Sequence, residues 1–176
     1  MVELATGRSY EDRLTGRAAR SRMDEPAELL EAEKQIARVL AHHPREPKWR
    51  QAKARTDVFE GNYQLAIEEL TKLQADRPGD VTIQFDLAIA YYGRARTQRD
   101  AVAKATDFQF SLRSLNVVLG QNPNNAVALF DRALVYKQLK QYSEANSDWH
   151  RYLQLDPSGP WADEALRQMQ DKGLER

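Results

Sequence analysis

Histidine is the side chain in this sequence best suited to acid–base catalysis or metal binding near neutral pH. The chain has three, His42, His43 and His150. Adjacent His42 and His43 point in different directions on a helix, and they fall in the last turn of a predicted helix, where a partly positive side chain suits the helix dipole. His150 falls on the outward face of its own predicted helix. Since no histidine pair has the four-residue spacing of helical zinc ligands, we predict no metal site.

Other catalytic patterns are missing from the sequence as well. It has no cysteine, which excludes thiolate catalysis, disulfides and cysteine-ligated zinc or iron–sulfur sites. No glycine-rich loop could cradle a phosphate, because Gly61, Gly93 and Gly120 fall at predicted helix ends, where backbone freedom explains them. Serines and carboxylates are spread at surface spacing without a nearby base. We predict no catalytic residue, no cofactor and no enzyme activity.

Charge and hydropathy exclude several kinds of partner. The 176 residues contain 26 Lys or Arg and 26 Asp or Glu, so no net field draws the chain onto nucleic acid or an anionic membrane. No apolar run approaches the ~18 residues that would span a bilayer. The first residues, MVELATGRSYEDRL, lack the apolar core of a secretory signal. We expect a cytoplasmic protein with a protein or peptide partner, no nucleic-acid binding and no membrane insertion; homo-oligomerisation stays open.

Prolines mark an internal repeat that covers most of the chain. Pro44, Pro78, Pro123 and Pro157 are separated by 34, 45 and 34 residues, so the middle interval is the common one plus 11. Columns counted backwards from the prolines hold similar residues: Leu29, Tyr63, Phe108 and Tyr142; Ala32, Ala66, Ser111 and Ala145; Ile36, Leu70, Leu115 and Trp149; Val39, Leu73, Val118 and Tyr152. Columns counted forwards are Ala54, Ala88 and Ala133, then Asp57, Tyr91 and Tyr136.

Apolar residues in each repeat recur at helical spacing, in two segments. Small residues at the contact columns let two helices approach closely, and such a hairpin buries its apolar face only against its neighbours. The sequence therefore predicts an all-α fold of stacked hairpins. The expected helices are 25–43, 47–59, 62–76, 80–96, 105–121, 125–139, 142–155 and 161–172.

The stretch 126–159, AVALFDRALVYKQLKQYSEANSDWHRYLQLDPSG, resembles a tetratricopeptide repeat (TPR). The matching residues are Ala133, Tyr136, Tyr142, Ala145, Trp149 and Pro157. The resemblance implies an α-solenoid of antiparallel helical hairpins with a C-terminal capping helix. It divides the chain into a polar N-terminal arm (1–23), a half-repeat (24–44), three repeats (47–78, 81–123 and 126–159) and a cap with its tail (160–176). The arm is either flexible or anchored on the repeats through Tyr10 and Leu14.

In the TPR family the first helix of each hairpin lines a concave groove, and the resemblance implies a peptide-binding groove here. The expected groove residues are Gln51, Arg55, Phe59, Phe85, Asp86, Ile89, Tyr92, Phe130, Asp131, Leu134 and Lys137. Four of them would form an apolar strip: Phe85, Ile89, Phe130 and Leu134. Asp86 and Asp131 beside it would face a basic residue of a bound helix or peptide. Alternatively, the aromatic residues pack against the lengthened second hairpin or a terminal segment.

Some TPR proteins grip a C-terminal carboxylate with Lys, Asn and Arg side chains of their first helices. The positions that match in this chain are Gln51, Arg55, Asp86, Val127 and Asp131. Because two aspartates would repel a carboxylate, a chaperone-tail clamp is not expected.

The 11-residue insertion falls in GRARTQRDAVAKATD. Eleven residues make about three helical turns, so both helices of this hairpin could lengthen without losing phase, with a turn near Thr97 to Asp100. The protruding tip would then carry Arg94, Arg96, Arg99 and Lys104. Such a tip is either merely solvated or a basic docking site for an acidic partner.

A second resemblance concerns context. The segment LFDRALVYKQLKQYSEANSDWHRYLQLDPSGPWADEALRQM is similar to the TPR regions of bacterial proteins associated with caspase-like CHAT domains. A CHAT domain needs a catalytic His and Cys, so here it would lie on another polypeptide or a further C-terminal part. We expect a non-catalytic interaction scaffold or adaptor. The alternative is a regulatory TPR segment of a larger bacterial protein, packing in cis against an effector domain.

Overall fold

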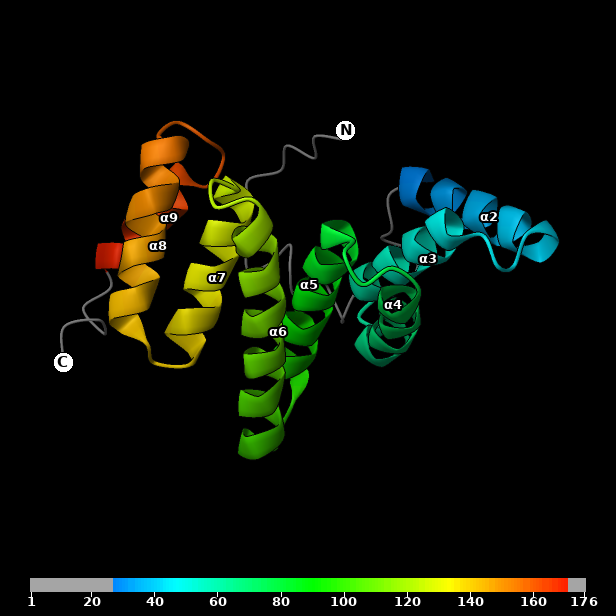
Figure 1. Cartoon of the computed structure of the whole chain (residues 1–176), viewed down its shortest axis with the longest axis horizontal. Coiled ribbons are helices and arrows are strands. Elements are labelled where there is room, and N and C mark those ends of the chain that lie inside the picture. The colour runs from blue at the N-terminus through cyan, green and yellow to red at the C-terminus, as the bar shows by residue number, and fades with distance from the viewer. Residues whose placement is uncertain (1–26, 171–176) are drawn as a thin grey trace.

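The computed structural model describes residues 27–170, which form an array of helices (Figure 1). Among these residues there are eight helices and no strand: α2 (Ala27–His42), α3 (Pro47–Phe59), α4 (Tyr63–Asp76), α5 (Val81–Thr97), α6 (Ala101–Gln121), α7 (Ala126–Gln138), α8 (Tyr142–Leu155) and α9 (Ala162–Gln170). The predicted all-α fold is confirmed. The polar arm at 1–23, with Tyr10 and Leu14, lies outside the described residues.

Consecutive helices pair into three hairpins, α3–α4, α5–α6 and α7–α8, as Figure 1 shows. Helix α2 packs on α3 at one end of the array, and α9 packs on α8 at the other. The first helices of the hairpins are therefore α3, α5 and α7. They carry all of the residues expected to line the groove.

The alanine columns lie where the helices touch. Ala54, Ala88 and Ala133 are buried on the first helices, and Ala66 and Ala145 are buried on the second helices. Columns of larger residues fill the space between hairpins. The largest fully buried side chains are those of Trp149, Tyr152 and Phe130. This division between small contact residues and large filling residues is what close-packed helices require.

Ser111 stands where the other second helices have alanine, and the structure shows why it fits. Its side chain is fully buried, and its hydroxyl donates a hydrogen bond of 2.8 Å to the carbonyl oxygen of Ala88. A buried hydroxyl costs little once it is hydrogen-bonded. Ser111 therefore joins α6 to α5 at the contact column.

The insertion lengthens both helices of the second hairpin. Helix α5 has 17 residues against 13 in α7, and α6 has 21 against 14 in α8. These four and seven extra residues account for the eleven inserted ones. The turn lies between Thr97 and Ala101, in the expected place. Helix α6 starts earlier than expected because Asp100 caps it, accepting a hydrogen bond from the Ala103 amide.

Two arginines tie neighbouring hairpins together in the same way. Arg94 on α5 donates two hydrogen bonds to Asp107 on α6, at 2.9 and 2.6 Å, and a third to Gln64 on α4. Arg132 repeats this pattern on α7. Its donors reach Asp148 on α8 at 2.6 and 2.7 Å and Asn116 on α6 at 2.8 Å. Each guanidinium thus joins three helices through a bidentate carboxylate pair.

The structure corrects the expectation that Gly93 marks a helix end. Gly93 is buried inside α5, four residues before its end, and a Cβ there would overlap the ring of Tyr63 on α4. Close approach between helices, and not backbone freedom, therefore explains this glycine. Gly61, by contrast, has a φ of 83° just after α3, where glycine is favoured.

We expect Gly93→Ala to lower the free energy of unfolding by about 1 kcal/mol, because overpacking against Tyr63 outweighs the gain in helix propensity. Gly120→Ala in α6 is the matched control, since nothing lies within 4 Å of the added methyl group. It should leave stability unchanged or raise it by about 0.5 kcal/mol. Urea unfolding of both variants checks this, and an unfolding energy of Gly93→Ala equal to that of the control would contradict the close approach.

Candidate functional site

The expected groove residues occupy equivalent positions on α3, α5 and α7, and we call the surface that carries them the first-helix face. Counting from the repeat prolines gives three sets of equivalent positions: Gln51, Phe85 and Phe130; Ala52, Asp86 and Asp131; Arg55, Ile89 and Leu134. The members of each set differ in burial and in interaction partners, because each first helix packs against a different neighbour.

Asp86 is already paired within the chain. Arg55 Nε on α3 lies 2.9 and 2.8 Å from the two carboxylate oxygens of Asp86, and Gln51 Nε2 donates to one of them at 2.6 Å. Burial raises the pKa of Asp86, and these hydrogen bonds and the Arg55 charge oppose that shift. The three residues join α3 to α5, so Asp86 is not an open site for a partner's basic residue.

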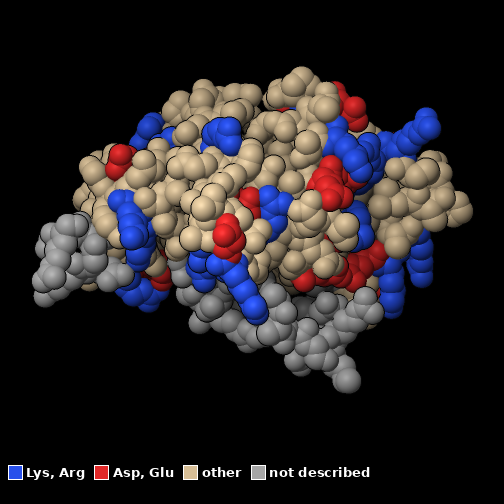
Figure 2. Space-filling model, turned by 90° about the horizontal axis from the view of Figure 1, so that it is seen from below, with Lys and Arg blue, Asp and Glu red and all other residues tan. Residues whose placement is uncertain are grey.

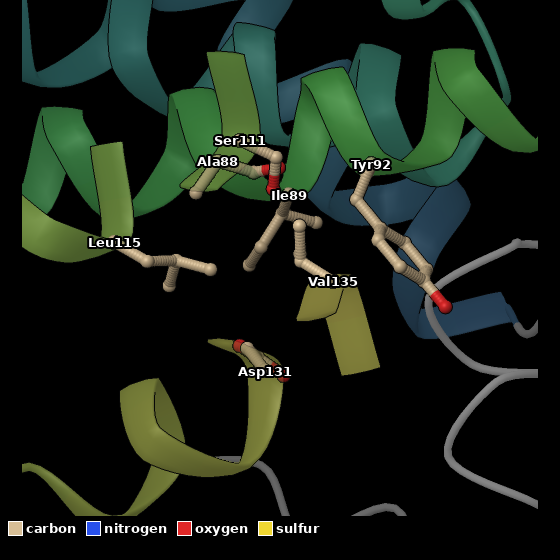
Figure 3. A pocket seen from close by; sticks show the side chains of 7 residues that line it. All are labelled: Ala88, Ile89, Tyr92, Ser111, Leu115, Asp131 and Val135. Atoms are coloured by element: carbon tan, nitrogen blue, oxygen red, sulfur yellow. The ribbon is translucent and has the colours of Figure 1, made fainter. Parts of the chain in front are cut away.

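Asp131 has the same position on α7 and a different environment. It is only 5% exposed, and neither carboxylate oxygen has a hydrogen-bond partner among the described residues. Burial raises the pKa of Asp131 well above its usual range. Figure 3 shows its side chain facing a small cavity of about 10 Å³ between α5, α6 and α7. The other residues that line the cavity are Ala88, Ile89, Tyr92, Ser111, Leu115 and Val135.

Phe130 and Leu134 do not form a surface strip, which corrects the expectation from helical position. They are 0% and 1% exposed. The Phe130 ring packs edge-on against Tyr152, with centroids 5.3 Å apart, and lies 6.2 Å from Trp161, which precedes α9. The C-terminal segment therefore covers Phe130, as the alternative interpretation held. These two residues serve the core.

Tyr92 and Lys137 are also engaged inside the chain. Tyr92 is buried and packs against Phe108 of the lengthened hairpin, with centroids 5.6 Å apart. Lys137 Nζ donates to Gln168 Oε1 of α9 at 2.5 Å, so it helps to hold the last helix. Neither side chain is available to a partner in this arrangement.

Part of the first-helix face does remain at the surface. Phe59 at the end of α3 is 42% exposed and Val127 at the start of α7 is 45% exposed. Phe85 and Ile89 between them are half-buried. The accessible apolar set is therefore Phe59, Phe85, Ile89 and Val127, which is smaller than expected and centred on α5.

The expected basic tip also exposes fewer of its residues than the sequence predicted. Arg94 is not on the tip, because its guanidinium is held by Asp107 and Gln64. Arg96 and Lys104 are half-buried, and Arg99 is exposed in the turn between α5 and α6. Figure 2, which views the molecule from below, shows basic and acidic side chains next to one another and no broad patch of one sign. The structure therefore does not single out the tip as a site.

A larger hollow of about 390 Å³, which the sequence did not indicate, lies between α2, α3 and α4. Its walls carry charged residues that already pair with one another: Arg50 with Glu69, and Lys53 with Asp57. The described residues hold no group of three His, Asp or Glu side chains arranged to bind a metal ion. His42, His43 and His150 are all exposed. In the same part of the chain no helix is long and apolar enough to cross a membrane.

Solved structures of TPR proteins are among those similar to this chain. The first TPR of Spaghetti (RPAP3), bound to the HSP90 peptide SRMEEVD, has a TM-score of 0.59 and 21% identity, covering 72% of this chain and 91% of that one. TTC0263, a thermophilic TPR protein of Thermus thermophilus, has a TM-score of 0.62 and 24% identity, covering 79% and 82%. No protein-family model and no curated protein matches the chain. Nothing in these comparisons links it to a CHAT domain. The protein therefore has an all-α fold of TPR-like helical repeats.

Proposed function

We propose that the protein is a non-catalytic interaction module that binds a peptide or helix on the first-helix face. The observation that carries this proposal is the accessible apolar set on α3, α5 and α7, together with Asp131, whose carboxylate has no hydrogen-bond partner within residues 27–170. Stacked helical repeats place equivalent positions of successive helices on one continuous face, which suits an extended or helical ligand.

The peptide bound to one of the similar structures supports a peptide as the ligand of this chain, but it does not support an acidic one. The HSP90 peptide bound by the Spaghetti domain, SRMEEVD, is acidic at its C-terminal end. In this chain the first-helix face carries Asp86 and Asp131, and no described residue supplies a cation to Asp131. Because like charges repel at short range, an acidic tail is a poor fit. The ligand that suits this face is apolar with a basic residue.

We expect Val127→Asp to weaken peptide binding by about tenfold, because it puts a charge in the accessible apolar set. The matched control is Val117→Asp on the second helix α6, since Val117 and Val127 are similarly exposed, at 42% and 45%. The probe is a peptide selected from a phage-displayed random library against the full chain, and titration calorimetry gives its Kd. Val117→Asp should leave Kd within about twofold.

Three results would count against the proposal. One is that no peptide is selected by the folded chain. Another is that the two variants bind equally well. The third is that Val117→Asp is the weaker binder, which would place the ligand on the second helices.

A further inference from the structure

Asp86 and Asp131 occupy equivalent positions on α5 and α7, but among the described residues only Asp86 has hydrogen-bond partners. At Asp86 the preceding first helix supplies Arg55 and Gln51, whose nitrogens reach the carboxylate at 2.6 to 2.9 Å. At Asp131 the preceding first helix is α5, and the positions of Arg55 and Gln51 are held there by Ile89 and Phe85. Neither of these side chains can donate a hydrogen bond. The second aspartate therefore lacks the guanidinium and amide that complete the first.

The surroundings of Asp131 do not make up for this loss. The cavity it faces is lined mainly by aliphatic side chains of α5, α6 and α7, and none of the described residues that line it is positively charged (Figure 3). The polar hydrogen of Ser111 is used by the Ala88 carbonyl. A buried carboxylate without donors is costly, so a group that brings charge-assisted hydrogen bonds would gain free energy by meeting it.

Phe85 and Ile89 suit the rest of an arginine side chain. Both are half-buried on the first-helix face, and Ile89 lines the cavity that Asp131 faces. The methylene stem of arginine packs on apolar surface, and its planar guanidinium stacks on aromatic rings. The cavity holds about one water molecule. Both carboxylate oxygens of Asp131 are buried, so a guanidinium reaches them only when side chains that line the cavity, such as Ile89, move aside.

We propose that a partner peptide inserts an arginine between α5 and α7, where its guanidinium takes at Asp131 the place that Arg55 holds at Asp86. This inference rests on the proposed function and names the residue that the ligand must carry. The occupant is a separate peptide. The alternative source of the same group is the chain's own arginines at 8, 13, 17, 20 and 22, which lie outside the described residues.

The test uses peptides selected from the same phage-displayed library against the full wild-type chain. We expect one arginine to recur among them, and its replacement by citrulline, which removes the charge and keeps the shape, to raise Kd about tenfold or more. In Asp131→Asn that replacement should change Kd by less than about twofold, because the partner of the arginine is gone. Carboxyl NMR should show the pKa of Asp131 falling when the peptide binds.

Ile89→Arg provides a second, independent variant. It places a guanidinium on α5 at the position that Arg55 has on α3, so it should pair with Asp131 in cis and remove the benefit of the peptide's arginine. The citrulline and arginine peptides should then bind this variant equally. A full citrulline effect in both Asp131→Asn and Ile89→Arg would overturn the proposal, since the arginine would pair elsewhere.

The two proposals fail differently. If Val127→Asp weakens binding but the selected peptides need no arginine, the arginine site is wrong and the peptide-binding face stands. If Val127→Asp and Val117→Asp bind equally, the face itself is wrong. Changing the five N-terminal arginines to glutamine should leave Kd within about twofold. An affinity gain of about tenfold would show that the chain's own segment is the occupant, and would overturn the choice of a separate peptide.

Discussion

Replacing Arg94 with leucine is expected to lower the free energy of unfolding by about 3–5 kcal/mol, because it leaves a buried carboxylate without its cation. The carboxylate is that of Asp107, whose side chain is 4% exposed and receives two hydrogen bonds from Arg94. The same hydrogen bonds, which Arg94 donates to Asp107, raise the pKa of Arg94. Urea unfolding at neutral pH measures the loss.

Arg99→Leu is the control for this experiment, since Arg99 is exposed in the turn a few residues further on. It should change the free energy of unfolding by less than about 0.5 kcal/mol. Adding Asp107→Leu to Arg94→Leu should recover part of the loss, because the stranded charge is removed. Equal small effects at Arg94 and Arg99 would mean that the three-helix tie does not stabilise the array.

Asp131→Asn should have the opposite sign and raise the free energy of unfolding at neutral pH by about 1–3 kcal/mol. The variant removes a buried negative charge that no described residue compensates. Asp86→Asn should gain less, since hydrogen bonds from Gln51 and Arg55 already offset part of the burial cost at that position. A residue that lowers stability and is not needed for packing is what a binding site retains.

The pH dependence of the free energy of unfolding tests independently whether the Asp131 carboxylate destabilises the folded chain. Burial raises its pKa in the folded chain, so the folded state holds the proton more tightly than the unfolded state does. The contribution of Asp131 to wild-type stability should therefore fall as the pH rises from the unfolded pKa, about 3.9, through the folded pKa. The advantage of Asp131→Asn should be small below about pH 4 and grow above it. A variant less stable than wild type at neutral pH would mean that the ionised carboxylate already has a partner.

The contact columns made most of the fold predictable from the sequence. Ala54, Ala88 and Ala133 occupy one column because every hairpin needs a close contact at the same height, and their burial follows the count from the prolines. The turn of the lengthened hairpin was predictable for a similar reason, since eleven residues keep helical phase. Features repeated in each hairpin leave a periodic signal that one sequence can reveal.

The candidate site was less predictable, because each repeat meets a different neighbour. Position on the helix placed Phe130 on the first-helix face but carried no information about Trp161, which covers it from beyond the last repeat. It also named Arg55 and Asp86 without showing that they pair with each other. Only the structure distinguishes Asp86, which is satisfied, from Asp131, which is not.

The three-helix ties left a signal in the sequence that could have been used. Arg94 and Asp107 are 13 residues apart across one turn, and Arg132 and Asp148 are 16 apart across the next. A basic residue midway or late in a first helix and an aspartate early or midway in the second can meet when the hairpin closes. Arg94 adjoins the inserted residues in the sequence, but its partner Asp107 lies across the turn, so its guanidinium is not on the tip.

The most direct test of peptide binding on the first-helix face is to map where the selected peptide binds on the full chain by amide NMR. We predict the largest chemical-shift changes at Ile89, Val127 and Asp131, on α5 and α7, together with a new contact between the peptide's arginine and the Asp131 carboxylate. The amides of Leu65 and Val117, on the second helices α4 and α6, should not change. Changes confined to α4, α6 and α8 would contradict the central claim that the first-helix face is the binding surface.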